Sequence, residues 1–224
     1  MLQRLSTMLR SRIEDMVTLP ESLAMCEQKG EERILRLYGH ILASSDTIDN
    51  VGDDGDLKVG CRAVELIEQI LAYNYLDKGI PPSKRIPVRL FIDSPGGDLV
   101  EGFSLVSIIE QSKTPIHTVN LSFWCSSAFY VGIAGHKRFS MPRATFLMHE
   151  GELCLTDSMH KVQDQARFYA KYVESIIKPH VTDKSRMGEK EYEYFARKEL
   201  VMLPEDAQRY GFIDEIVTDI DTIL

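Results

Sequence analysis

The sequence predicts an α/β protein in which helices and strands alternate along one large domain. Apolar residues alternate at Val88, Leu90 and Ile92, which is typical of a strand, and this strand continues into two glycines. The preceding stretch, from Val59 to Leu71, carries apolar residues at helical spacing. With 224 residues and 44 % hydrophobic composition, the chain can bury the core of a single domain.

The same patterns predict the other elements. Further strands are expected at residues 34–42, 116–121, 145–149 and 212–217, and further helices at 98–111, 126–134, 157–178 and 204–210. The helix at 157–178 is long for a surface helix. Its apolar face consists of Met159, Val162, Ala166, Tyr169, Val173 and Ile176. We expect it to end at or just before Pro179, because a residue that precedes proline disfavours helical geometry.

Composition excludes several classes of function. The 26 basic and 34 acidic side chains give a net charge of −8, so a nucleic-acid partner is not expected. The apolar run "AFYVGIAG" is far shorter than the roughly 20 residues of a membrane span, and none is expected. The cysteines at positions 26, 61, 125 and 154 form no CxxC pair, and no HExxH occurs. We therefore expect no disulfide framework, metal or organic cofactor, and a cytoplasmic location.

Two adjacent glycines follow the strand in "FIDSPGGDLVEG", residues 91–102. Without side chains, Gly96 and Gly97 would let backbone amides point outward and hold a negatively charged oxygen. A tight turn that requires positive φ explains the same residues. Both interpretations stay open at this point.

Small polar residues stand where the next strand meets a helix, in "SFWCSSAFYVGIAG". Ser126 or Ser127 would there face the free amides and the positive dipole end of the helix, as a nucleophile requires. The alternative is that Ser126 is an ordinary helix N-cap.

A serine nucleophile needs a base, and the chain has six histidines, at positions 40, 117, 136, 149, 160 and 180. His149 is favoured because it ends the strand "TFLMH" and precedes a loop, where catalytic residues concentrate. The alternative is a hydrogen-bonded structural histidine.

The stretches "FIDSPGGDLVEG", "SSAFYVGIAG", "KRFSMPRATFLMH" and "PEDAQRYGFIDEI" resemble, in order and spacing, the ClpP peptidase family over roughly residues 33–217. The resemblance implies a ClpP/crotonase-like fold of repeated β-β-α units with a protruding handle helix at about 157–178. The peptidase domain would span residues 33–224. Residues 1–32 would be an N-terminal extension that serves as an axial gate, a partner-binding segment or a removed propeptide.

The resemblance also implies roles for individual residues. Ser126 keeps the family's spacing to the Ala-Gly pair after the helix, so it would be the nucleophile, with His149 as base. The backbone amides of Gly97 and Ser127 would form the oxyanion hole. Where the family has small residues before the serine, this chain has the bulky pair "FW", which puts substrate access in doubt.

The third triad member departs from the family pattern, because no aspartate occurs between Asp183 and Asp206. In the family, the aspartate stands shortly before the stretch that matches "PEDAQRYGFIDEI". The position at the family's distance before Gly211 is Glu199, and the one at the family's distance before Pro204 is Lys198, so Glu199 is the expected acid. Glu199 can instead be a solvated helix-end charge. In that case the role would fall to one of four side chains, Asp183, Glu193, Gln163 or Gln165, or to a backbone carbonyl.

The function implied by the resemblance is that of a serine endopeptidase that cleaves unfolded polypeptides through an acyl-enzyme. The family forms heptameric rings stacked in pairs, and a ring-shaped ATPase unfoldase supplies the substrate.

Two alternatives to this function remain. The missing aspartate and the bulky Phe123 and Trp124 favour a catalytically impaired ring subunit, and the fold alone also suits a crotonase-like acyl-CoA enzyme, which needs no serine-histidine pair.

Overall fold

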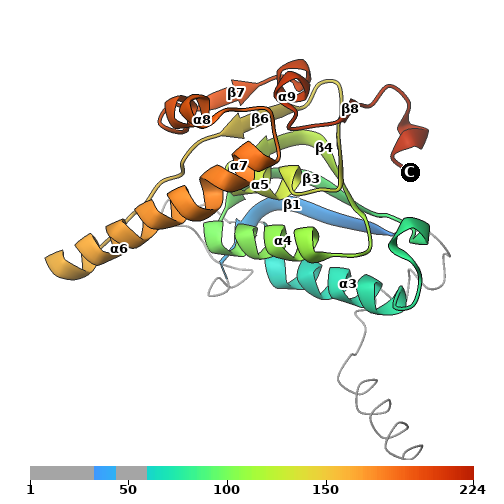
Figure 1. The fold of residues 1–224 in the computed structure, drawn as a ribbon, viewed down its shortest axis with the longest axis horizontal. Coiled ribbons are helices and arrows are strands. Elements are labelled where there is room, and N and C mark those ends of the chain that lie inside the picture. Colours follow the sequence, from blue (N-terminus) through green and yellow to red (C-terminus); the bar gives the residue numbers. More distant parts are fainter. Residues whose placement is uncertain (1–32, 44–59) are drawn as a thin grey trace, which may run out of the picture. The chain divides into compact units, whose positions relative to one another are not determined.

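A mostly parallel sheet lies at the centre of residues 34–224 (Figure 1). The computed structural model describes residues 33–43 and 60–224, so the expected N-terminal extension and the polar loop after residue 43 lie outside the described residues. The strand order is β2-β1-β3-β4-β5-β8, and β6 pairs with β4 while β7 pairs with β6. All pairs are parallel except β6 with β7. The predicted α/β class is confirmed.

The central strands carry most of the core. They are β1 (Ile34–Leu42), β3 (Val88–Gly97) and β4 (Ile116–Cys125). Helices α3 (Ala63–Leu76) and α4 (Leu99–Gln111) run side by side along one face of the sheet, and α5 (Ser127–Ile133) is buried along its whole length (Figure 1). Asp98 caps α4 by accepting a hydrogen bond from the Glu101 amide at 2.9 Å.

Several predicted boundaries are confirmed. The strand at 34–42 is β1, and the helix at 204–210 is α9 (Pro204–Tyr210), which ends at Gly211 in the left-handed conformation with φ 78°. The strand predicted at 145–149 is β6 (Thr145–Met148). In the described part of the chain, none of the helices is long and apolar enough to cross a membrane.

Short elements escaped prediction. These are β2 (Gly60–Arg62), β5 (Lys137–Ser140), β7 (Leu200–Met202) and α8 (Glu189–Ala196). The predicted strand at 212–217 is reduced to β8 (Glu215–Ile216), while β4 continues beyond its predicted end to Cys125. A strand of three or four residues is too short for alternation to show, so only its pairing with neighbouring strands defines it.

The long predicted helix continues beyond its expected end. It consists of α6 (Met159–Tyr172), a π-helical turn (Val173–Ile177) and α7 (Lys178–Asp183), which we call together the handle (Figure 1). The prediction that it ends before Pro179 is therefore wrong. In a π-helical turn the backbone hydrogen bonds join residues five apart instead of four. With such a turn just before Pro179, the helix can continue although proline has no backbone N–H to donate.

Among the described residues, the outer part of the handle packs against no part of the core. None of the residues of α6 is buried, and the side chain of Phe168 is 61 % exposed. The predicted apolar face is divided, because Val173 packs against the core while Met159 and Ile176 are exposed. An apolar surface on a helix that projects from its domain is typical of a contact with another molecule.

Lys178 joins the base of the handle to α8. Its ammonium lies 3.3 Å from a carboxylate oxygen of Glu174, 3.2 Å from Glu189 and 2.7 Å from Glu193. The side chain is only 11 % exposed, so these pairs are less screened by water than ordinary surface pairs. They fix α8 against α7.

Candidate active site

Ser126 and His149 follow the ends of two neighbouring parallel strands. Cys125, the last residue of β4, pairs with Leu147 of β6, and the Ser126 amide donates to the Leu147 carbonyl oxygen at 3.0 Å. His149 comes directly after β6. Because carboxyl ends of parallel strands meet at one edge of a sheet, the two half-buried residues belong to the same edge.

Glu199 reaches this edge from the antiparallel strand β7. Met148 pairs with Leu200, so the next step of the same register places Glu199 opposite His149. Burial, and after it the charge of Glu199, raises the pKa of the Cys125 thiol, which indicates that the carboxylate lies near the residue before Ser126. Glu199 is exposed and follows a turn after α8, so its interpretation as a solvated charge stays open.

Ser126 has a strained backbone. Its φ of 55° and ψ of −127° make it the one non-glycine residue with positive φ in the described part of the chain. Such a conformation costs on the order of 1–3 kcal/mol and is concentrated at functional sites. Ser126 occupies the N-cap position of α5, but its side chain makes no capping hydrogen bond, so capping does not explain why a serine stands there. A strained serine between a strand and a helix is the arrangement of a nucleophile elbow.

The glycine pair lies against Ser126. Gly96 and Gly97 have φ values of 92° and 145°, which supports the interpretation as a turn that requires positive φ. A Cβ atom at Gly96 would lie 2.8 Å from Ser126 Cβ, and one at Gly97 would lie 2.2 Å from the Ile41 carbonyl oxygen. The turn therefore also forms a boundary of the site, where a side chain has no room.

Hydrogen bonds set the direction of the glycine turn. The Gly96 amide donates to Ser94 Oγ at 3.1 Å, and Ser94 Oγ donates to the Gly39 carbonyl oxygen at 2.6 Å. Ser127 Oγ donates to the Gly97 carbonyl oxygen at 3.1 Å, which brings the two predicted oxyanion-hole residues together. The Ser127 amide is the first of α5 and has no acceptor within its own helix.

No hydrogen bond links the imidazole of His149 to any of the residues that the structure describes. Its Nε2 atom is buried without a hydrogen-bond partner among the described residues. The interpretation as a hydrogen-bonded structural histidine therefore has no support. Within residues 33–43 and 60–224, no hydrogen bond joins the side chains of Ser126, His149 and Glu199 to one another either.

The bulky residues before the nucleophile do not both face the site. Trp124 is fully buried and packs edge-on against Phe146, with ring centroids 5.5 Å apart. Gly132 of α5 leaves the space for it, since a Cβ atom there would lie 2.4 Å from the indole ring. Trp124 is therefore a core residue, whereas Phe123 is half-buried.

The other candidates for the acid have different partners or positions. Glu193 binds Lys178, and Asp183 lines a polar pocket of about 520 Å³ to which Arg138 also contributes. The remaining two lie on exposed positions of α6: Gln163 and Gln165. Of the acidic candidates, Glu199 is the one that the strand register brings opposite His149.

Two contacts at His149 were not anticipated from the sequence. The Tyr130 hydroxyl donates to the His149 carbonyl oxygen at 2.7 Å, and the Glu150 amide donates to the Ala196 carbonyl oxygen at 3.1 Å. The sequence held one indication of the Tyr130 contact. Tyr130 carries a hydroxyl in a largely apolar helix, one turn after Ser126, and a buried hydroxyl needs a hydrogen-bond partner.

Comparisons with known proteins identify the family of the chain. The Clp protease family model matches residues 63–219. A proteolytic subunit 2 of the ATP-dependent Clp protease from Treponema denticola is 26 % identical over 157 residues, covering 68 % of this chain and 76 % of the relative. A proteolytic subunit from Deinococcus radiodurans is 24 % identical over 199 residues, covering 85 % of this chain and 89 % of the relative. The chain belongs to the Clp protease family.

Proposed function

We propose that this chain is a serine endopeptidase subunit that cleaves unfolded polypeptides through an acyl-enzyme. The observation that carries the proposal is Ser126, held in a strained conformation between a strand and a helix with its hydroxyl free of capping. The imidazole of His149, whose Nε2 atom has no hydrogen-bond partner among the described residues, lies at the adjoining strand end and supplies the base that a serine nucleophile requires.

The chemistry follows from these positions. His149 takes the proton of Ser126 Oγ as that oxygen attacks the carbonyl carbon of the scissile peptide bond. The amides of Gly97 and Ser127 stabilise the oxyanion, and Glu199 stabilises the imidazolium. When the intermediate collapses, the C–N bond breaks and His149 passes the proton to the leaving amine. A water molecule then attacks the acyl-enzyme and gives a proton to His149. The ester bond to Ser126 Oγ breaks, His149 returns the proton to that oxygen, and the carboxylic acid product leaves. Hydrogen bonds between such groups commonly tighten only when substrate binds.

Assembly and partners form the second part of the proposal. The relatives from Treponema denticola and Deinococcus radiodurans carry the names of proteolytic subunits of an ATP-dependent protease. By analogy, this chain would form heptameric rings stacked in pairs and receive unfolded chains from a ring-shaped ATPase. The exposed apolar side of the handle supports a contact between copies of the chain.

Labelling with a fluorophosphonate probe tests the proposed activity. Such a probe reacts with a serine that a neighbouring base activates, so we expect one adduct per chain, located at Ser126 by mass spectrometry of the digested protein. A folded protein that takes up no probe would contradict the proposal and favour the alternative of a catalytically impaired ring subunit.

A charged substitution on the handle tests whether the handle forms a contact between copies of the chain. Phe168→Asp places a carboxylate on a residue that has no role in the core, and we expect it to break the assembly into smaller species because the contact would bury that charge. Sedimentation velocity should show a wild-type mass many times the 25.5 kDa chain. Gln163→Asp adds the same charge at an exposed position of α6 that lies on a different face from Phe168, so it is the control and should assemble normally. A wild-type protein that is active as a monomer would contradict this part of the proposal.

A further inference from the structure

We propose that Tyr130 is a positioning residue that holds the backbone of His149 in place for catalysis by Ser126. This inference rests on the proposed peptidase function. It concerns the contact between the Tyr130 hydroxyl and the His149 carbonyl oxygen, which are 2.7 Å apart.

The contact joins the two reacting residues through one short helix. Tyr130 lies on α5 one turn beyond Ser126, and its side chain is 2 % exposed. The first turn of α5 positions the nucleophile, while its second turn holds the carbonyl of the base. A shift of the helix therefore moves both residues together, so their separation is kept.

The Tyr130 hydroxyl can act only as a donor in this contact, because a carbonyl oxygen only accepts. Burial, the largest cause, raises the pKa of Tyr130 well above its ordinary value, so the hydroxyl keeps its proton at neutral pH. The hydrogen bond to His149 is thus maintained over the pH range in which a histidine base works.

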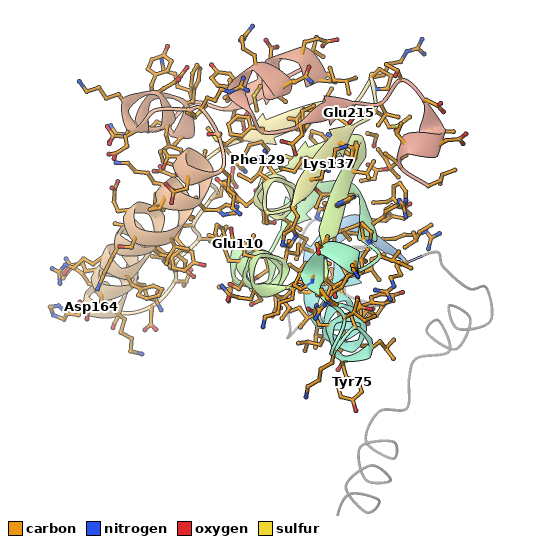
Figure 2. The ribbon with its side chains drawn as sticks, turned by 45° about the vertical axis from the view of Figure 1, so that its right-hand side comes forward. Tyr75, Glu110, Phe129, Lys137, Asp164 and Glu215 are labelled. Carbon is orange, nitrogen blue, oxygen red and sulfur yellow. The ribbon has the colours of Figure 1, made fainter. Side chains whose placement is uncertain are left out.

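Tyr130 is itself held by contacts with α4 and with α7 of the handle. Its ring packs against Phe103 with centroids 5.4 Å apart, and its own carbonyl oxygen accepts from His180 Nε2 at 3.0 Å. His180 Nδ1 lies 3.3 Å from Glu110 Oε1, and the hydrogen bond with His180 is the main reason why the pKa of Glu110 falls to about 2. Figure 2 shows Glu110 on α4, on the side toward the handle. The position of Tyr130 is therefore fixed by α4 and α7 as well as by its own helix.

His149 depends on such a contact because no regular element follows it. No helix or strand is formed between the end of β6 and the start of α6, within residues that the structure describes. Besides the Tyr130 contact, the neighbouring Glu150 amide donates to the Ala196 carbonyl oxygen at 3.1 Å. The first contact leads to the helix of Ser126, and the second leads to the turn that precedes Glu199.

The test compares two buried tyrosines. Tyr130→Phe removes one hydroxyl and keeps the ring, and we expect kcat for a peptide substrate to fall about tenfold with KM nearly unchanged, because the base loses its alignment. Tyr192→Phe is the matched control. Tyr192 is 1 % exposed, and its hydroxyl has no hydrogen-bond partner among the described residues, so its removal should leave kcat at the wild-type value.

A second measurement does not require peptidase activity. Diethyl pyrocarbonate modifies unprotonated imidazoles, and mass spectrometry gives the rate at each histidine. We expect His149 in Tyr130→Phe to react several-fold faster relative to the exposed His160, with no such change in Tyr192→Phe, because the loosened backbone exposes the buried Nε2 atom.

The outcomes separate the two claims. Faster modification of His149 alone, with buried His180 unchanged, supports the role of Tyr130. Equal rates in all three proteins, or acceleration of His149 and His180 together through general loosening, would overturn it. A wild-type protein that takes up no fluorophosphonate would contradict the proposed function instead, while the modification rates would still decide whether Tyr130 holds His149.

Discussion

Ser126→Ala is expected to abolish peptide hydrolysis and fluorophosphonate labelling, with a loss in kcat of about 10⁶-fold, as in serine peptidases that lose their nucleophile. The substitution should not disturb the fold, because the side chain caps no helix and alanine retains the Cβ atom that packs beside Gly96. Peptide turnover and sedimentation should be measured on the same preparation. Assembly is expected to remain unchanged.

Two neighbouring residues provide the controls for Ser126→Ala. Ser127→Ala keeps the backbone amide and loses only the hydrogen bond to the Gly97 carbonyl, so it should still accept the probe and retain measurable turnover. Cys125 is buried, and that burial raises the pKa of its thiol, which makes it a poor nucleophile. Full activity in Ser126→Ala, or inhibition by a thiol reagent that depends on Cys125, would refute the assignment of the nucleophile.

Glu199→Gln is expected to lower kcat by at least roughly tenfold, because an amide cannot stabilise the imidazolium of His149 as a carboxylate does. The upper bound is about 3 × 10⁴-fold, the loss that accompanies removal of the acid in subtilisin. Little change in assembly is expected, since Glu199 is exposed and lies outside the handle. Steady-state kinetics with a short peptide would measure the effect.

Glu193→Gln is the matched control for Glu199→Gln. Glu193 lies on α8 and binds Lys178 at 2.7 Å, so its substitution should weaken the junction of the handle with α8 and leave the chemistry intact. Normal turnover in Glu199→Gln together with a strong loss in Glu193→Gln or Asp183→Asn would move the acid elsewhere. Normal turnover in all three variants would leave the orientation of His149 to an uncharged group.

The sequence predicted those elements that have a strong local signal. Strand β1 has enough residues for alternation to show, and α9 is closed by Gly211, whose positive φ ends a helix cheaply. Strand β7 has three residues and no such signal, although it is the strand that places Glu199 opposite His149. Pairing between strands that are distant in sequence depends on the tertiary fold. Glu199 could therefore be predicted only from its spacing to Gly211 in the family pattern.

Predictions from short stretches of sequence also failed where tertiary packing decides which way a side chain points. Trp124 suggested an obstructed site, but the space at Gly132 lets the indole turn into the core. Pro179 suggested a helix end, but a π-helical turn precedes it. The hydroxyl of Tyr130 could not be matched with the His149 carbonyl from sequence, because the match depends on how α5 packs beside the end of β6.

Residues 150–198 separate the proposed base, His149, from the proposed acid, Glu199, and they include the whole handle and α8. By contrast, β3, α4, β4 and α5 are consecutive and carry Gly97, Ser126 and Ser127. Contacts between consecutive elements cost little chain entropy, whereas the pairing of β6 with β7 must close that long segment. During folding, the nucleophile and its oxyanion donors would therefore be assembled before acid and base meet. A nascent chain that has not yet added Glu199 to the sheet would therefore carry Ser126 without the proposed acid beside His149.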